Sequence, residues 1–271
     1  MSAPGFLDKA RFALRRRLAT VTSVGDGSNS FLFHCDSLVD VMRARTLMTK
    51  ESGTVQWIHE YVKPGDIFYD IGANMGLYTV LAGVRVGHAG AVYAFEPHVV
   101  NVHTLMRNVK ANRLAPQVQV LSCALNDQQG YFDFNYYSDV SGSSNSQLNG
   151  ARDGAEREFN PVLTERKYAT TVDTLIASGV IKPANHVKID VDGNEMLILR
   201  GMSGLLGSRA VLRSIQVEVN PRYKSALFDL MGAHGYQVAV RHFTQEGKAR
   251  LASGADPEEI AYNAIFTPTL N

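Results

Sequence analysis

The sequence has few of the features that mark several large classes of protein. Its 271 residues include only two cysteines, Cys35 and Cys123, which lie far apart. A disulfide framework or a zinc site needs more cysteines at closer spacing, so the sequence predicts neither. No apolar run approaches the ~20 residues that a membrane-spanning helix needs. The scarcity of cysteine suits a reducing compartment, and we expect a cytoplasmic protein.

An excess of charge of either sign is also missing. Lys and Arg number 27 against 26 for Asp and Glu, which gives a net charge of +1. Nucleic-acid-binding proteins usually carry a basic face, so nucleic acid is not the favoured partner. At the start of the chain, Arg15, Arg16 and Arg17 follow apolar residues, the reverse of the order in a secretory signal. We expect a short basic amphipathic helix there, docked on the rest of the protein.

Two phosphate-binding motifs are incomplete in the stretch FYDIGANMGLYTVLAG, residues 68–83. The dinucleotide fingerprint needs a second glycine where Asn74 stands, and a P-loop would continue into Gly-Lys-Ser or Gly-Lys-Thr. The apolar run instead ends in Asp70, an acid that would repel a phosphate at a turn of this kind. An acid suits a cofactor with positive charges and no phosphate. The stretch therefore favours S-adenosylmethionine, which carries an ammonium and a sulfonium group.

Short apolar runs predict the framework around this turn. We expect strands at 67–71, 91–95, 118–121, 187–191 and 214–219, with helical patterns between several of them. The runs do not alternate with polar residues, as is usual for strands that are covered on both faces. Strand followed by helix, repeated, predicts a parallel sheet with right-handed crossovers. Two more strands are expected near the C-terminus, within 236–243 and 260–266.

The middle of the chain breaks this rhythm. Residues 131–137 alternate in polarity, a polar stretch continues to about residue 160, and a second extended run follows at 166–172. We interpret residues 130–172 as a β-hairpin inserted after the third strand, with a mobile connection. Ser143, Ser144 and Asn145 in that connection are weak candidates for contacts with a substrate rich in hydroxyls. A solvated turn explains the same composition equally well.

A second acid follows the next strand. Glu96, before Pro97, lies close to the ~20 positions beyond the glycine turn at which an acid binds ribose hydroxyls. Together with the turn it predicts a site for the cofactor. The residues expected to contact the cofactor are Asp70, Gly72, Ala73, Asn74, Gly76, Glu96, Pro97, Ala124 and Asp190.

With these motifs in place, the chain resembles the FkbM-type S-adenosylmethionine-dependent methyltransferases. The resemblance rests on DIGANMG at 70–76, FEP at 95–97 and KIDVDGNE at 188–195, and it covers roughly residues 55–222. It implies a class I methyltransferase (Rossmann-like) fold, an α/β fold with a seven-stranded, mostly parallel sheet and an antiparallel last strand. We expect an N-terminal extension over 1–54 and a methyltransferase domain over 55–271. Asp192 stands where members of the family often carry Glu.

The resemblance also implies O-methylation of a hydroxyl on a sugar, a glycan or a secondary metabolite. An alcohol is a poor nucleophile, so a positioned base is expected to help. The candidates are Asp190, Glu195 and Glu218, which lie at or just after the ends of central strands. Asp190 has a contact with the cofactor as its alternative role, and Glu195 an interaction with the dipole of its helix. Lys188, on the fourth strand, either extends its charge toward water or pairs with an acid, and the first role is favoured.

Other mechanisms and functions stay open. Asp190, Glu218 and Asn220 form a possible set of oxygen ligands for Mg²⁺, which would lower the pKa of an acceptor hydroxyl. Acid–base assistance without a metal is favoured over this alternative. Methylation of RNA or protein, and a module that binds the cofactor without turnover, are the remaining readings of the same motifs.

Overall fold

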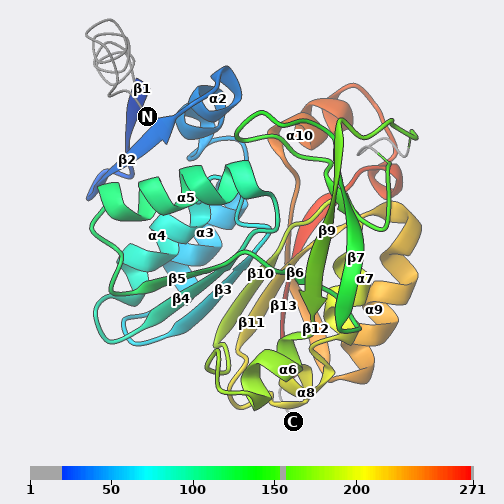
Figure 1. The fold of residues 1–271 in the computed structure, drawn as a ribbon. Coiled ribbons are helices and arrows are strands. Elements are labelled where there is room, and N and C mark those ends of the chain that lie inside the picture. The colour runs from blue at the N-terminus through cyan, green and yellow to red at the C-terminus, as the bar shows by residue number, and fades with distance from the viewer. Residues whose placement is uncertain (1–19, 153–156, 270–271) are drawn as a thin grey trace, which may run out of the picture.

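The computed structural model describes residues 20–152 and 157–269, so the basic segment predicted around Arg15 lies outside them. A seven-stranded sheet in the order β12-β13-β11-β10-β3-β4-β5 forms the centre of the molecule (Figure 1). Its strands are β3 (Ile67–Ile71), β4 (Ala91–Phe95), β5 (Val118–Leu121), β10 (His186–Ile189), β11 (Ser214–Val219), β12 (Tyr236–His242) and β13 (Tyr262–Pro268). β13 is antiparallel to both of its neighbours, whereas β11, β10, β3, β4 and β5 pair in parallel. This arrangement confirms the predicted fold.

Helices cover both faces of this sheet (Figure 1). One face carries α3 (Ser52–Tyr61), α4 (Leu77–Val86) and α5 (Val99–Ala111). The other carries α6 (Val172–Ala177), α7 (Glu195–Arg200), α8 (Ser203–Gly207) and α9 (Lys224–Ala233). The short helices η1 (Pro221–Tyr223) and η2 (Pro257–Glu259) and the helix α10 (Gln245–Ala252) lie in the C-terminal third. No helix within the described ranges has the length and apolar character needed to cross a membrane.

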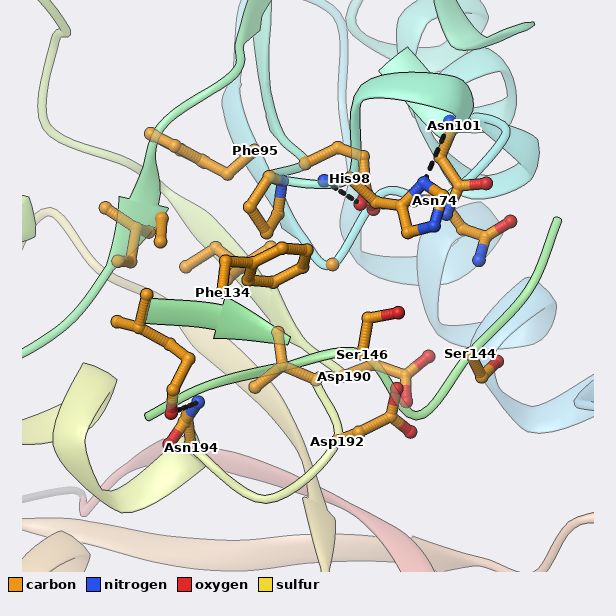
Figure 2. A pocket seen from close by; sticks show the side chains of 18 of the residues that line it. Asn74, Phe95, His98, Asn101, Phe134, Ser144, Ser146, Asp190, Asp192 and Asn194 are labelled. Atoms are coloured by element: carbon orange, nitrogen blue, oxygen red, sulfur yellow. Dashed lines mark hydrogen bonds between the residues drawn. The ribbon is translucent and has the colours of Figure 1, made fainter. Parts of the chain in front are cut away.

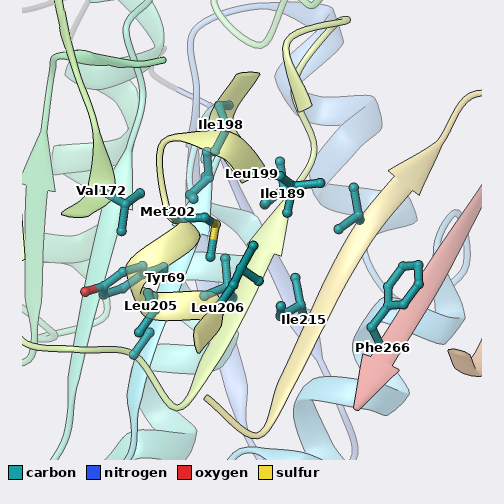
Figure 3. Close-up of a cluster of buried hydrophobic side chains, with 14 of the residues drawn as sticks. Tyr69, Val172, Ile189, Ile198, Leu199, Met202, Leu205, Leu206, Ile215 and Phe266 are labelled. Atoms are coloured by element: carbon teal, nitrogen blue, oxygen red, sulfur yellow. The ribbon is translucent and has the colours of Figure 1, made fainter. Parts of the chain in front are cut away.

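The two faces of the sheet differ in polarity. On the α7 face, Ile189 and Ile215 point toward Leu199, Met202 and Leu206 in a cluster of buried hydrophobic side chains (Figure 3). Residues at paired positions of neighbouring strands point to the same face. The pairing of Asp70 with Lys188, and of Lys188 with Gln216, therefore places a row of buried polar side chains on the opposite face. The row runs across β3, β10 and β11, near the carboxyl ends of β3 and β10.

A second sheet forms from the inserted segment and from β6, which precedes that segment in the chain. Its strands are β6 (Ala124–Leu125), β9 (Leu163–Thr170), β7 (Gly130–Tyr136) and β8 (Gln147–Leu148), in that spatial order. β9 pairs antiparallel with β7 along the whole length of β7, as the predicted hairpin requires. We call residues 138–149, which leave β7 and include β8, the strap.

The N-terminal extension contains elements that the sequence analysis did not predict. β1 (Thr20–Gly25) and β2 (Ser30–Cys35) form a hairpin, and α2 (Leu38–Thr46) follows it. The side chain of Ser37 accepts a hydrogen bond from the backbone N–H of Asp40, and that of Asp40 accepts one from Ser37. This capping box was the signal in the sequence that could have located the start of α2.

Candidate active site

A cleft opens at the carboxyl ends of β3, β4 and β10 (Figure 2). It has a volume of about 840 Å³, and a smaller cavity of about 440 Å³ shares four of its lining residues. Of the residues predicted to bind cofactor or substrate, those that line the larger cleft are Gly72, Asn74, Glu96, Pro97, Ala124, Ser143, Ser144 and Asp190. Ala73 lines only the smaller cavity. Asp70, Gly76, Asn145, Glu195 and Glu218 line neither.

Two glycines of the turn after β3 meet strict steric demands. Gly72 has a φ of +78°, and a Cβ there would lie 1.9 Å from the carbonyl oxygen of Asp190. Gly76 has a φ of +88°, and a Cβ there would lie 2.3 Å from Cδ1 of Leu105. Glycine tolerates such angles and leaves the space free. The turn can therefore bring the ends of β3 and β10 together and start α4 close to α5.

Glu96 fixes the same turn from the end of β4. Its Oε2 accepts a hydrogen bond from the backbone N–H of Asn74 at 2.7 Å, and its Oε1 accepts one from the N–H of His98 at 2.9 Å. Burial raises the pKa of Glu96 to about 7, although both hydrogen bonds favour the charged form. A carboxylate has about four lone-pair sites, so this one can accept further hydrogen bonds from a ligand in the cleft.

Asp70 lies beneath the turn and is fully buried. Its Oδ2 accepts a hydrogen bond from Oγ1 of Thr79 at 2.5 Å, and its Oδ1 lies 3.5 Å from Nζ of Lys188. Lys188 also lies 3.1 Å from Oδ2 of Asp190. In this geometry Asp70 contributes charge to the site without reaching the cleft.

The expectation that Lys188 extends toward water is wrong. Its side chain is 1% exposed and lies between the carboxylates of Asp70 and Asp190. Burial disfavours the ammonium, but the carboxylates of Asp190 and Asp70 outweigh that effect and raise the pKa of Lys188. Burial likewise acts to raise the pKa of Asp190, and the ammonium of Lys188 outweighs it and lowers that pKa. Lys188 and Asp190 therefore stay ionised together.

Three further acids lie around Asp190, and their pKa values shift the other way. Burial raises the pKa of Asp192 to about 6 and that of Glu195 to about 8. Burial, together with the charges of neighbouring acids, raises the pKa of Glu218 well above its ordinary value. Only Asp192 of these three lines the cleft. Glu195 instead accepts a hydrogen bond from the N–H of Gly193 at 3.3 Å, at the start of α7.

The alternative magnesium ligands have other partners. Asp190 pairs with Lys188, and the side chain of Asn220 accepts a hydrogen bond at 3.1 Å from the N–H of Arg222. Across residues 20–152 and 157–269, no group of three or more His, Cys, Asp or Glu side chains is arranged to hold a metal ion.

The strap covers one side of the cleft and is hydrogen-bonded to several elements. The Oγ of Ser141 donates to Oδ1 of the buried Asp40 at 3.2 Å, and the N–H of Gly142 donates to Oδ1 of Asn101 at 2.8 Å. The side-chain amide of Asn74 donates to the carbonyl of Ser143 at 2.9 Å. Opening the strap would break these bonds, which limits the mobility expected of this connection.

Two lining residues that the sequence analysis did not select hold the far part of the strap. Arg43 of α2 donates from Nε to the carbonyl of Gly142 at 2.6 Å and from Nη2 to Oγ of Ser144. Asp192 accepts a hydrogen bond from the N–H of Asn145. The acidic motif at 188–195 marked the position of Asp192, but nothing in the sequence connected Arg43 with the cleft.

Comparison with known proteins places these features in a family. The sequence model of the FkbM methyltransferase domain matches residues 70–238. The antimetabolite synthetase AmbE of Pseudomonas aeruginosa is 28% identical over 214 residues, which are 66% of this chain and 10% of AmbE. The hexuronic acid methyltransferase AglP of Haloferax volcanii is 26% identical, over 70% of this chain and 72% of AglP. The 31-O-demethyl-FK506 methyltransferase FkbM of Streptomyces tacrolimicus is 28% identical, over 66% and 72%. This chain thus spans a tenth of the length of AmbE.

Solved structures were matched at low sequence identity. A candidate rRNA methylase from Clostridium thermocellum superposes with a TM-score of 0.50 at 11% identity, over 82% of this chain and 97% of that one. A methyltransferase FkbM from Methylobacillus flagellatus gives a TM-score of 0.46 at 14% identity, over 86% and 56%. The sheet order and the first of these likenesses show the class I methyltransferase fold. The family model matches more than half of the length of this chain, so the chain belongs to the FkbM methyltransferase family.

Proposed function

We propose that this protein is an S-adenosylmethionine-dependent O-methyltransferase that acts on a hydroxyl of a sugar, a glycan or a secondary metabolite. The observation that carries the proposal is the carboxylate of Glu96, which is held by two backbone N–H groups in the wall of the cleft. A fixed carboxylate next to a glycine turn suits the two ribose hydroxyls of an adenosine.

The rest of the cleft fits the other parts of this cofactor. Phe95, Leu125 and Ile198 supply apolar surface for a purine ring. The ionised Asp190 lies where the two cavities adjoin and favours a ligand with positive charge. Asn74 lines both cavities at the position where a pyrophosphate-binding turn has glycine. Its side chain disfavours the close approach that a pyrophosphate needs. When bound, S-adenosylmethionine would supply a methyl group on a sulfonium, already activated for transfer.

The names of two relatives support the acceptor class. AglP is named for a hexuronic acid and FkbM for an oxygen of FK506, so both names point to oxygen-rich acceptors. In this chain, we assign acceptor contacts to the strap, where the hydroxyls of Ser143 and Ser144 line the cleft. Asn145 lies between them and Asp192, and its role is to hold the strap in place.

A calorimetric titration tests the cofactor. The purified protein should bind S-adenosylmethionine and S-adenosylhomocysteine and show no measurable binding of NAD. Tight binding of NAD with no binding of S-adenosylmethionine would overturn the assignment. Both cysteines, Cys35 and Cys123, are free thiols, which supports the proposal of a cytoplasmic protein.

A panel of acceptors tests the reaction. The protein is incubated with S-adenosylmethionine and D-glucuronic acid, D-galacturonic acid, D-glucose, small alcohols, RNA or peptides, and S-adenosylhomocysteine release is measured. Methylation of a sugar hydroxyl supports the proposal, and Ser144→Ala should then raise KM for that sugar and leave the Kd of S-adenosylmethionine unchanged. Exclusive methylation of RNA or peptide would reject the acceptor class, and binding without turnover on any acceptor would indicate a binding module.

A further inference from the structure

The four acids at the ends of β10 and β11 differ in their access to the cleft. Glu195 and Glu218 line neither cavity, whereas Asp190 and Asp192 line the larger one. Figure 2 shows the side chains of Asp190 and Asp192 on the same wall of the cleft, with those of Ser144 and Ser146 nearby. A general base must come within hydrogen-bond distance of the proton that it removes, so geometry leaves Asp190 and Asp192.

The partners of these two carboxylates separate them further. Asp190 is paired with the buried ammonium of Lys188 at 3.1 Å, a permanent cation that stabilises its charged form and makes it a weak base. Asp192 forms no ion pair with any Lys, Arg or His in the described part of the chain. Its Oδ2 accepts one hydrogen bond, from the N–H of Asn145. Its second oxygen is therefore the one available to a ligand in the cleft.

We propose that Asp192 is the general base of the methyl transfer, and that the strap aims it through the hydrogen bond from Asn145. This inference rests on the proposed function and adds a catalytic residue to it. Asn145 has a φ of +67°, a left-handed angle that Asn adopts more readily than most residues, and its N–H donates to the carboxylate. The strap that contacts the acceptor would thus also orient the base.

The electrostatic environment suits this role. Burial, and next the charge of Asp190, raise the pKa of Asp192 to about 6, against the hydrogen bond from Asn145 and the cations Arg43 and Lys50. Glu96, Glu195 and Glu218 also lie within electrostatic range of it. Two neighbouring carboxylates whose environments push their pKa values apart are the pattern expected when one is a fixed charge and the other moves a proton.

The step balances without any further reactant. The acceptor hydroxyl gives its proton to the free oxygen of Asp192 as its own oxygen forms the bond to the methyl carbon. The carbon–sulfur bond breaks, and its electron pair stays on sulfur as the neutral thioether of S-adenosylhomocysteine. Asp192 then loses its proton to water at the open mouth of the cleft.

Asp192→Asn is the decisive variant, because an amide oxygen can still accept the hydrogen bond from Asn145 but cannot take a proton. We expect kcat on the sugar that the wild type methylates to fall by ~10²–10⁴-fold, with KM and the Kd of S-adenosylmethionine nearly unchanged. In the wild type, kcat/KM should rise with pH through about 6, since the base acts when deprotonated. Asp133→Asn, on the exposed side of β7, is the matched control and should behave as the wild type.

A second readout does not depend on turnover. With ¹³C-labelled aspartate carboxyls, NMR of the protein without ligand should show one resonance that titrates near pH 6 and is missing from Asp192→Asn. Retention of turnover within threefold by Asp192→Asn, or persistence of that resonance, would overturn the inference. Failure of the proposed function would instead appear as a wild-type protein that does not bind S-adenosylmethionine at all.

Discussion

Two buried polar networks lie on the same face of the central sheet, one at each end of the parallel strands. At the amino ends, Oγ of Ser214 accepts from Nε1 of Trp57 at 2.9 Å and lies 2.7 Å from Nδ1 of His186. Nε2 of His186 lies 3.2 Å from Asp66, which also binds Arg213. Two residues along β10 from His186, Lys188 holds the network at the carboxyl ends.

The two networks differ in how completely their polar atoms are paired. At the amino ends, burial lowers the pKa of His186 to about 4, so the ring is neutral, donates from Nε2 to Asp66 and accepts at Nδ1 from Ser214. Every polar atom of that ring has a partner. At the carboxyl ends, the buried Oδ1 of Asp70 and Oε1 of Gln216 accept no hydrogen bond within the described residues. Complete pairing adds rigidity to the network at the amino ends. Asp70 and Gln216 line neither cavity, so their unpaired oxygens lie beneath the cleft and do not face a ligand.

The largest effect is expected from removal of the cation at the carboxyl ends. Lys188→Met would leave the buried Asp70 and the adjoining Asp190 without their shared ammonium. Loss of one partner of a buried ion pair costs about 3–5 kcal/mol, because the other charge stays uncompensated. Urea denaturation followed by circular dichroism measures this loss of unfolding free energy.

Lys182→Met is the control for that change, since Lys182 is exposed and its hydrogen bonds within the described residues come from its backbone, whose carbonyl accepts from Tyr69 and whose N–H donates to Tyr93. Its effect should stay within about 0.5 kcal/mol. The double variant Asp70→Asn/Lys188→Met should recover part of the lost stability. Equal stability of Lys188→Met and the wild type would show that the ion network is not what stabilises this end of the sheet.

The next effect concerns affinity rather than stability. Glu96→Ala should weaken S-adenosylmethionine binding by about 1.5–3 kcal/mol, if ribose hydroxyls donate to the carboxylate. Burial raises the pKa of Glu96 to about 7, so the affinity should increase as pH rises through about 7. The same shift makes folding favour the protonated form, so this group's contribution to stability falls as pH rises from about 4.5 to 7.

Calorimetric titrations between pH 5.5 and 8.5 measure this dependence, and Glu96→Gln, which cannot ionise, is the matched variant. Its affinity should be flat over that range. A steep pH dependence that persists in Glu96→Gln would assign the titration to a different group in the cleft.

A smaller effect, on stability alone, is expected at the amino ends. Ser214→Ala removes the acceptor of Trp57 and the donor to His186, and it should cost about 1–3 kcal/mol because both partners stay buried and unsatisfied. The Kd of S-adenosylmethionine should not change, because the network lies away from the cleft. A change in Kd of more than threefold would mean that the two ends of the sheet are coupled.

The contrast between these networks also shows what the sequence could predict. Strand positions, the turn at Gly72 and the candidate Glu96 follow from local patterns, and the structure places Gly72 and Glu96 in the wall of one cleft. The pairing of Lys188 with an acid was only the less favoured of two expectations, because one of its partners, Asp70, lies on another strand. The sequence pattern of a charged residue within an apolar strand is the same whether its side chain extends to water or pairs with a buried acid.

Long-range contacts explain the other omissions. Arg43 meets the strap across about a hundred residues of sequence, and no local pattern records that contact. The predicted strand at 187–191 ends at Ile189, because the chain turns toward Gly193, which has a φ of +100°. The sequence marks Asp192 only as a departure from the family pattern. Its hydrogen bond to Asn145 of the strap joins residues 47 positions apart, so no local pattern indicates it.

The smallest effect is expected from a metal chelator. Mg²⁺ held by Asp190, Glu218 and Asn220 would have to compete with partners that these groups already have. The ammonium of Lys188 lies 3.1 Å from Asp190, and the amide oxygen of Asn220 caps η1. Burial also raises the pKa of Glu218 and so favours its protonated form, which is a poor ligand.

Turnover in 5 mM EDTA, roughly the excess that strips a divalent ion from such oxygen ligands, should therefore equal turnover in 5 mM MgCl₂ within about twofold. Complete loss in EDTA that Mg²⁺ restores would instead make these three residues metal ligands and would remove the need for Asp192 as a base.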